Sequence, residues 1–245
     1  MSIEFTNDSP GVSDVPGFRV GAAGCDIRNK GQDRLDLALI VADQLCTAAG
    51  VFTTNDVKAG PVRISQATLL SSQGRVRGVI ANSGNANACT SSQGDADAVR
   101  MAQLGAEAAG HAGEAFLVCS TGRIGELLPM EKVAAGATAA AARLSRDSAE
   151  GVRAANAILT SDTRPKTCTA RFTWQGQTVT IAGFAKGAGM IHPNMATMIV
   201  AITTDAEATP ADLDGMLRHA VDRSFHRISI DGDTSKPAWR YNSPN

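Results

Sequence analysis

The chain is organised around Lys186-Gly-Ala-Gly-Met-Ile-His-Pro-Asn-Met-Ala-Thr-Met-Ile-Val200. A loop with two glycines carries a single lysine, Lys186, and the Pro193-Asn194 pair that follows favours a turn, because proline fixes its own φ. Thr197 then stands at the head of an apolar, β-branched run, residues 198–203, which predicts a strand. A threonine between a tight turn and a buried strand is a candidate nucleophile.

The chemistry of such a threonine depends on a nearby base. A threonine hydroxyl is a poor nucleophile unless a base removes its proton as it attacks. An α-amino group, with a reference pKa of about 7.7–8.0, is well placed for this near neutral pH. Cleavage of the Ala196–Thr197 peptide would put both groups on Thr197, and the hydroxyl could itself attack the Ala196 carbonyl to form an ester that water hydrolyses. From this segment alone, the simpler interpretation is a threonine that begins a strand.

Composition excludes several classes of protein. The chain has 245 residues, of which 43% are hydrophobic and 19% are charged, so it can bury a large core. Its net charge is −1, it has no basic block, and it contains only seven Phe, two Trp and one Tyr, which argues against a nucleic-acid partner. No apolar run approaches the roughly 18 residues of a membrane span. We therefore expect no nucleic acid and no membrane among its partners.

The N-terminus and the cysteines predict a cytoplasmic protein. The first eight residues are acidic and lack the basic and apolar regions of a signal peptide. Five scattered cysteines, an odd number without CxxC spacing, indicate reduced thiols rather than disulfides or a zinc site. The four histidines form no metal-binding pattern, and Asp231-Gly-Asp233 lacks the downstream glutamate of a calcium loop, so we expect no metal.

Strand and helix patterns alternate along the chain, with hairpins between them. This predicts an α/β fold, a layered sandwich of mixed β-sheets flanked by helices. The expected strands are residues 35–42 with 46–53 as partner, 76–81, 115–119, the hairpin 166–174 and 178–183, 198–203, and 227–230. The expected helices are residues 61–70, 95–109, 129–144, 147–159 and 209–223, whereas residues 1–20 look polar and rich in turns.

Two loops could contribute to a catalytic site. Ser120-Thr121-Gly122 follows a buried strand, and backbone N–H groups beside the threonine hydroxyl could form an oxyanion hole; an ordinary strand-to-helix turn is the simpler alternative. The loop 82–90, rich in Asn and Gly, is either a tight connection or a wall of an active site. Lys186 is either a solvated lysine or a cation that faces a substrate carboxylate.

Taken in order, these segments resemble the ornithine acetyltransferase family of arginine biosynthesis. The resemblance rests on the sequence 186–198 together with four further segments, namely residues 85–90, 120–122, 158–163 and 227–235. It extends from about Gly17 to Ser235, and the motif around the cleavage site is highly specific.

The resemblance implies a fold and a mechanism. The fold would be a sandwich of two sheets flanked by helices, related to the DmpA-type aminopeptidases. Family members cut themselves before the motif threonine, here between Ala196 and Thr197, into α and β chains that assemble as an α/β heterotetramer. The new N-terminal threonine takes the acetyl group of N2-acetyl-L-ornithine and passes it to L-glutamate, which makes the enzyme a glutamate N-acetyltransferase. No cofactor is needed, although some members accept acetyl-CoA as acyl donor.

The family's functional residues fall on particular positions of this chain. The oxyanion-hole pair falls on Thr121 and Gly122, and the substrate-binding threonine and lysine fall on Thr160 and Lys186, with Thr197 as nucleophile. Acyl transfer needs a nucleophile, a base and an anion hole, so each role has a candidate.

The chain departs from the family pattern at its end. The resemblance covers a domain of residues 1–235, with a prospective α chain 1–196 and a β chain from Thr197, whereas residues 236–245 form a divergent tail. Family members continue into a second half that supplies a glutamate, an asparagine and hydroxyl residues to the substrate site. Two alternatives therefore stay open. The chain is an inactive fold remnant or assembly partner, or it is a DmpA-type hydrolase that uses water as acceptor.

Overall fold

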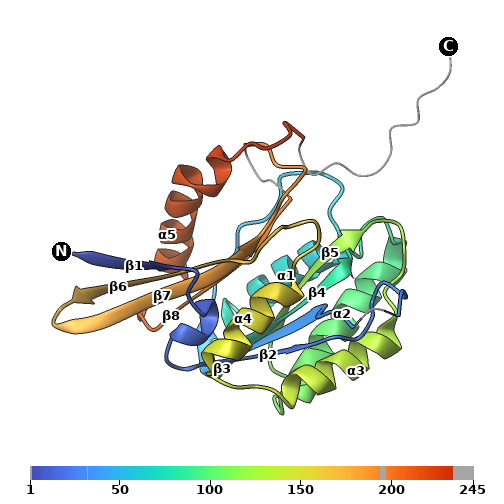
Figure 1. The fold of residues 1–245 in the computed structure, drawn as a ribbon, viewed down its shortest axis with the longest axis horizontal. Helices are drawn as coiled ribbons and strands as arrows, with labels where there is room; N and C mark the ends of the chain where they lie inside the picture. The colour runs from blue at the N-terminus through green and yellow to red at the C-terminus, as the bar shows by residue number, and fades with distance from the viewer. Residues whose placement is uncertain (1, 32, 194–196, 234–245) are drawn as a thin grey trace.

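Two four-stranded sheets form the centre of the molecule (Figure 1). The computed structural model describes residues 2–31, 33–193 and 197–233. Sheet A has the order β1-β6-β7-β8 and sheet B the order β2-β3-β4-β5. All neighbours are antiparallel except β4 and β5. The strands are β1 (Ile3–Asn7), β2 (Phe18–Ala23), β3 (Leu37–Thr47), β4 (Arg75–Asn85), β5 (Phe116–Arg123), β6 (Lys166–Trp174), β7 (Gln177–Lys186) and β8 (Ile199–Thr204).

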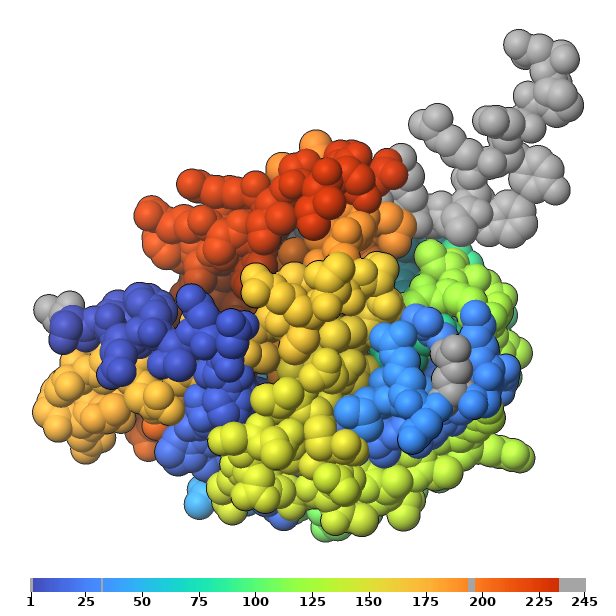
Figure 2. Space-filling view, in the orientation of Figure 1, coloured from blue at the N-terminus to red at the C-terminus, as the bar shows by residue number. Residues whose placement is uncertain are grey.

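Helices complete the layers around sheet B. Three of them cover one of its faces, while α4 and a short 3-10 helix, η1, pack with sheet A against the other face. After β8 a further helix, α5, leads to a second 3-10 turn, η2. The helices are η1 (Gly11–Asp14), α1 (Gly60–Ser71), α2 (Ser91–Ala108), α3 (Met130–Ala141), α4 (Ser148–Ala157), α5 (Pro210–Arg223) and η2 (Phe225–Arg227). Figure 2 shows α3 and α4 on the near face of the molecule, with α5 at its upper edge. The expected α/β sandwich flanked by helices is confirmed.

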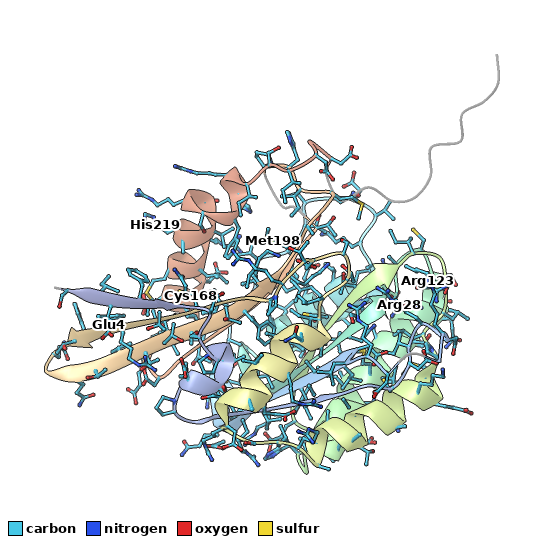
Figure 3. The ribbon with its side chains drawn as sticks, in the orientation of Figure 1. Glu4, Arg28, Arg123, Cys168, Met198 and His219 are labelled. Carbon is cyan, nitrogen blue, oxygen red and sulfur yellow. The ribbon has the colours of Figure 1, made fainter. Side chains whose placement is uncertain are left out.

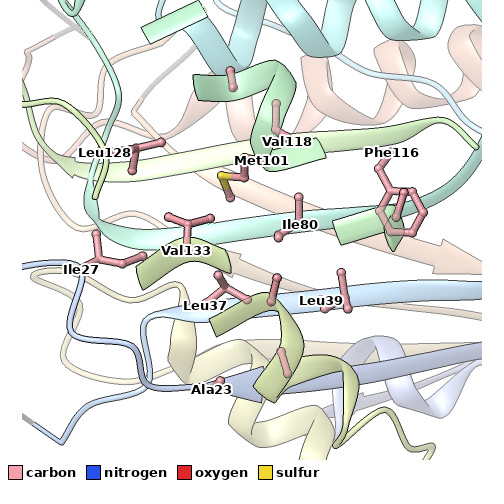
Figure 4. Close-up of a cluster of buried hydrophobic side chains, with 14 of the residues drawn as sticks. Ala23, Ile27, Leu37, Leu39, Ile80, Met101, Phe116, Val118, Leu128 and Val133 are labelled. Carbon is pink, nitrogen blue, oxygen red and sulfur yellow. The ribbon is translucent and has the colours of Figure 1, made fainter. Parts of the chain in front are cut away.

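Strand β3 explains why the molecule has two cores. Successive side chains of a strand point to opposite faces. Leu37, Leu39 and Val41 enter the core beneath the helices, whereas Ala38 and Ile40 enter the core shared with sheet A. Figure 4 shows Leu37 and Leu39 together with Met101 and Phe116. A strand that is buried on both faces reads as a continuous apolar run, which is why residues 35–42 are recognisable in the sequence.

The hairpin of β6 and β7 is confirmed. Gln175 and Gly176 connect the strands, and both have positive φ, 49° and 80°. Two positive φ values are typical of the type I′ turn, whose twist matches that of paired strands. The hairpin then extends β7 as far as Lys186, three residues beyond its predicted end.

Two expected strands are wrong. Residues 46–53 do not form a partner of β3: Cys46 and Thr47 lie in β3 itself after a register shift that follows Val41, and they pair with β4. Residues 227–230 do not form a strand either, because Ile228 closes a turn onto Phe225 and Ile230 donates a single hydrogen bond to Ile191.

The N-terminal region also differs from its expected turns. It contains β1, η1 and β2, and β2 is an edge strand of sheet B that pairs only with β3. Its apolar residues alternate with glycine and a polar side chain, so a strand pattern is hard to recognise in the sequence. Within the described part of the chain, no helix combines the length and the hydropathy needed to cross a bilayer.

The outer face of sheet A carries exposed apolar side chains. Five large side chains from all four strands are exposed on it: Ile3 (48%), Phe5 (68%), Trp174 (58%), Ile181 (37%) and Ile202 (49%). The strand alternation that buries Ala182 and Phe184 on the inner face places these five on the opposite face.

Gly21 provides a test of the packing between β2 and α3. A Cβ at this position would lie 2.1 Å from the Ala140 carbonyl oxygen, so Gly21→Ala forces strand and helix apart. We expect Gly21→Ala to lower the free energy of unfolding by about 1–3 kcal/mol, measured by urea denaturation.

Gly215 in α5 is the matched control. A Cβ there meets no atom within 4 Å, so Gly215→Ala should raise the free energy of unfolding by roughly 0.5–1 kcal/mol through helix propensity. A Gly21→Ala variant as stable as the wild type would contradict the close contact of β2 with α3.

Candidate functional site

The ends of β4 and β5 bring the first part of the site together. In this parallel pair Ser83 lies opposite Thr121 and Gly84 opposite Gly122. Gly122 has a φ of +136°, and a Cβ on it would lie 2.3 Å from the carbonyl carbon of Gly84. No other residue fits this close approach. The segment 120–122 therefore belongs to a strand that continues to Arg123, and the alternative of an ordinary turn is wrong.

The asparagine-rich loop after β4 holds these strand ends in place. The Asn85 side chain donates hydrogen bonds to the carbonyls of Glu126 and Leu127, both at 3.1 Å. The buried Asn87 donates to Gly94 O at 2.7 Å, and its own Oδ1 accepts the Thr90 hydroxyl at 2.8 Å. The loop therefore ties β4 to the segment after β5 and to the first turn of α2. Its asparagines therefore hold the backbone around the site through hydrogen bonds.

Lys186 and Thr121 meet across the sandwich. Lys186 continues the inner face of β7 after Ala182 and Phe184, and Thr121 continues the inner face of β5 after Cys119. The Lys186 Nζ donates a hydrogen bond to Thr121 Oγ1 at 3.0 Å, and both side chains are buried. The resemblance placed these two residues in one site, and the structure brings them into contact.

Burial makes the Lys186 ammonium easier to deprotonate. The side chain is 4% exposed, and desolvation lowers the pKa of its ammonium. The carboxylate of Asp162 acts in the opposite direction, while the charge of Lys166 lowers the pKa further. The fold thus holds a cation at a place where it is costly, an arrangement more common at functional sites than at structural ones.

Thr197 lies beside Gly187, the residue that follows this lysine. β8 pairs with β7 so that Ile199 lies opposite Lys186. A Cβ on Gly187 would lie 3.3 Å from the Thr197 carbonyl oxygen, so these two backbones are in close contact. The Thr197 N–H donates to Met190 O at 3.0 Å. Its hydroxyl is buried and has no hydrogen-bond partner within the described residues. Ala196, the other half of the predicted cleavage site, lies outside those residues.

Asp162 joins Thr160 to the Lys186 loop. Its carboxylate accepts the Gly187 N–H at 2.8 Å and the Thr160 N–H at 3.4 Å, and it forms an ion pair with Lys166 at 2.6 Å. Burial alone would raise the pKa of this carboxyl, but the hydrogen bonds from Lys166 and the two N–H groups lower it. Thr160 is thereby placed near Lys186 through Asp162 and not by direct contact.

A small pocket lies beside Ser83, the residue opposite Thr121 in sheet B. It is lined by Asp26, Arg28, Arg34, Asp36 and Ser83, and Arg34 donates a hydrogen bond to the Leu159 carbonyl, next to Thr160. Arg28 and Arg123 are labelled next to each other in Figure 3. The Arg123 side chain donates a hydrogen bond to the Arg28 carbonyl at 2.8 Å. Desolvation, then the charges of Arg34 and Arg123, lower the pKa of Arg28.

Two acidic residues of the site were missed by the sequence analysis. Asp162 was quoted only as part of the segment 158–163, and Asp231 only as part of a rejected calcium loop. Both accept backbone N–H groups of the glycine-rich loop. Aspartates before and after a glycine-rich loop can accept its backbone N–H groups, and this was the available signal. The sequence analysis missed it because both residues lie far from the loop in the sequence. The described residues contain no group of three or more His, Cys, Asp or Glu side chains suited to a metal.

Comparison with known proteins identifies the family. The ArgJ family model matches residues 19–237. The chain belongs to the ArgJ family. The expected relationship to the ornithine acetyltransferases is thereby confirmed. An arginine biosynthesis bifunctional protein ArgJ from Symbiobacterium thermophilum is 51% identical over 225 residues, which are 92% of this chain and 55% of that protein. The chain spans about half the length of the curated relatives that it matches.

Solved structures agree with the family and the fold. The ornithine acetyltransferase of Mycobacterium tuberculosis, crystallised with ornithine, has a TM-score of 0.71 and 38% identity, and covers 82% of this chain and 100% of its own. The Bacillus halodurans ArgJ protein has a TM-score of 0.71 and 33% identity over 81% of this chain and 100% of its own. An aminopeptidase of Ochrobactrum anthropi with an Ntn-hydrolase fold, 14% identical with a TM-score of 0.51, shares the fold alone.

The buried charge of Lys186 gives a prediction about stability. A lysine whose pKa is lowered on folding binds fewer protons in the folded than in the unfolded state, so it destabilises the fold below its folded pKa. That penalty is relieved as the pH rises through the folded pKa towards the unfolded value of about 10.4. We expect Lys186→Met to be at least as stable as the wild type at pH 7, with the advantage shrinking as the pH rises.

Thermal unfolding of both proteins between pH 7 and pH 10 measures this difference. The control is Lys30→Met, at an exposed lysine outside the contacts described for the site. A Lys186→Met variant that is clearly less stable than the wild type at pH 7 would contradict the prediction. It would mean that the buried lysine stabilises the fold.

Proposed function

We propose that this chain carries the nucleophile of an ornithine acetyltransferase. In this proposal the Thr197 hydroxyl attacks the carbonyl of Ala196. The peptide nitrogen takes the proton, the Ala196–Thr197 C–N bond breaks, and an ester to the Thr197 oxygen remains beside the free α-amino group. Water then hydrolyses the ester, which gives the carboxylate of Ala196 and restores the Thr197 hydroxyl. The observation that carries the proposal is the Thr197 hydroxyl, which is buried without a hydrogen-bond partner within the described residues. The Thr197 backbone lies against Gly187, the residue after the lysine that contacts Thr121.

Acetyl transfer would then proceed in two half-reactions. The α-amino group of Thr197 takes the proton of its own hydroxyl, which attacks the acetyl carbonyl of N2-acetyl-L-ornithine. Ornithine leaves with a proton on its amine, and an acetyl ester remains on Thr197. The amine of L-glutamate then attacks this ester and regenerates the hydroxyl. Thr121 and Gly122 would stabilise the oxyanion in both steps, while Thr160 and Lys186 would hold the substrate, with the ammonium facing its carboxylate.

The lengths of the relatives support the division into two chains. The two solved ArgJ-family chains are each covered completely by about four fifths of this chain, so each is shorter than this chain. The curated relatives are about twice as long as this chain. Such a difference is expected if members are made as one chain and cut into two. Assembly into an α/β heterotetramer, use of acetyl-CoA as a second donor and a cytoplasmic location remain parts of the proposal.

Intact-protein mass spectrometry tests the self-cleavage. The freshly purified chain should give two species whose masses add up to the whole chain plus one water, with the cut between residues 196 and 197. Thr197→Ala should give one uncut species, because the hydroxyl is gone, whereas Thr197→Ser should still cut. Thr204→Ala, which removes a hydroxyl at the far end of β8, is the control and should cut like the wild type. A cut Thr197→Ala variant would disprove the mechanism.

The acyl acceptor separates the proposal from its two alternatives. Incubation of the cut chain with N2-acetyl-L-ornithine should add one acetyl group to the fragment that begins at Thr197, and L-glutamate should remove it as N-acetylglutamate. Loss of the acetyl group to water alone would favour a hydrolase of the aminopeptidase kind. An uncut chain that gains no acetyl group would favour a fold remnant or an assembly partner.

The Thr121 hydroxyl gives a separate test of the oxyanion hole. Thr121→Val keeps the shape of the side chain and removes the hydroxyl, so formation of the acetyl-enzyme should slow by about 10²–10³-fold. A substitution at Gly122 is less informative, because no side chain fits there. Ser120→Ala is the matched control, since the neighbouring Ser120 hydroxyl makes no hydrogen bond within the described residues. Rapid-quench mass spectrometry measures both rates, and equal rates would remove Thr121 from the oxyanion hole.

A further inference from the structure

The segment after η2 returns to the loop that precedes the nucleophile. Ile230 donates its N–H to Ile191 O at 2.9 Å. The Asp231 carboxylate accepts the Met190 N–H at 2.6 Å on one oxygen and the Ile191 N–H at 3.0 Å on the other. Met190 has a φ of +53°, and successive N–H groups next to a left-handed residue form a concave site for an anion. Here the anion is the carboxylate of Asp231.

The peptide unit between Met190 and Ile191 carries this contact on to Thr197. Its N–H points to Asp231, and its carbonyl, on the opposite edge of the same rigid plane, accepts the Thr197 N–H at 3.0 Å. Hydrogen bonds in such a chain polarise one another, so the charged acceptor at one end strengthens the bond at the other. The nitrogen of Thr197 is thus held by a carboxylate that it does not touch.

We infer that Asp231 is a positioning residue that sets the orientation of the Thr197 nitrogen through the Met190–Ile191 peptide. This inference rests on the proposed function, in which that nitrogen belongs first to the bond that is cut and then to the amine that activates the hydroxyl. Rotation of this peptide plane would move the Met190 carbonyl, which is the acceptor of the Thr197 N–H, and would change the orientation of that nitrogen.

The surroundings of Asp231 fit this role. The residue is exposed, yet the pKa of its carboxyl is lowered, first by the hydrogen bond from Met190 and then by that from Ile191. The carboxylate is therefore charged at neutral pH. Asp162 holds the other end of the same loop through Gly187. Two carboxylates from distant parts of the sequence thus fix the backbone from residue 187 to residue 191.

Self-cleavage of Asp231 variants tests the role of the carboxylate. Asp231→Asn keeps the size of the side chain but turns an amide donor towards one of the two N–H groups, so cleavage should slow by about 10–100-fold. Asp231→Glu keeps two acceptors on a longer side chain and should restore part of the rate. A merely structural role at this exposed position would give the opposite order, with Asn tolerated better than Glu. Asp214→Asn, at a carboxylate on α5 that pairs with Arg218, is the matched control and should cut at the wild-type rate.

Hydrogen exchange gives a test that does not depend on cleavage. In the uncleavable Thr197→Ala background, adding Asp231→Asn should speed exchange of the residue-197 amide by about tenfold or more, because its acceptor is no longer held. The mass of the wild-type chain decides the proposed function separately. If the wild type is uncut but the amide is deprotected in the double variant, the proposed function fails and the Asp231 contact stands. An unchanged amide at residue 197, or an Asn variant that cuts faster than the Glu variant, overturns the inference.

Discussion

The hydrogen bond from Lys186 to Thr121 is the contact on which the site depends. It joins the inner faces of two sheets at one end of the sandwich, and it buries a cation between them. Burial of a charge is costly, so the surrounding structure has to fix the lysine in place. The neighbours do so: the lysine lies in β7, Asp162 holds the next residue, Gly187, and β8 pairs with β7 so that the Thr197 backbone lies against Gly187. The packing and strand pairing around Lys186 thus offset the free energy that burial of its charge costs.

Backbone geometry contributes as much to the site as side chains do. Gly122 is in a conformation and a contact that only glycine allows, and Met190 is left-handed although it carries a side chain. Such positions persist when their surroundings over-determine them. The Asn85 side chain fixes the segment after Gly122 through the carbonyls of Glu126 and Leu127, and the Asp231 carboxylate accepts the Met190 N–H. In both places a polar side chain holds the backbone next to an unusual conformation.

Local patterns in the sequence predicted the elements whose apolar residues repeat with a clear period. The run 35–42 and the hairpin 166–183 are of this kind, and the helix after Thr209 begins as its capping hydroxyl predicts. Residues 46–53 were misassigned because the register shift after Val41 comes from tertiary pairing. The site residues were found through the family motif. Asp231 was missed because its role is defined by a fold that brings it back to Met190 from about forty residues away, which local spacing does not reveal.

The pairing of β7 with β8 spans the point at which the chain would be cut. A cut between residues 196 and 197 leaves six residue pairs of this ladder intact, together with the contacts of Asp231 and Ile230 to the loop on the other side. The folded molecule would therefore keep its shape and its mobility on a native gel. Unfolding would separate the two chains, one with β7 and the other with β8. Their reassociation would be a second-order reaction whose rate depends on concentration. The uncut protein folds as one chain, whereas the cut protein, once unfolded, would not reassemble at high dilution. The lifetime of the cut protein would then be set by its rate of unfolding.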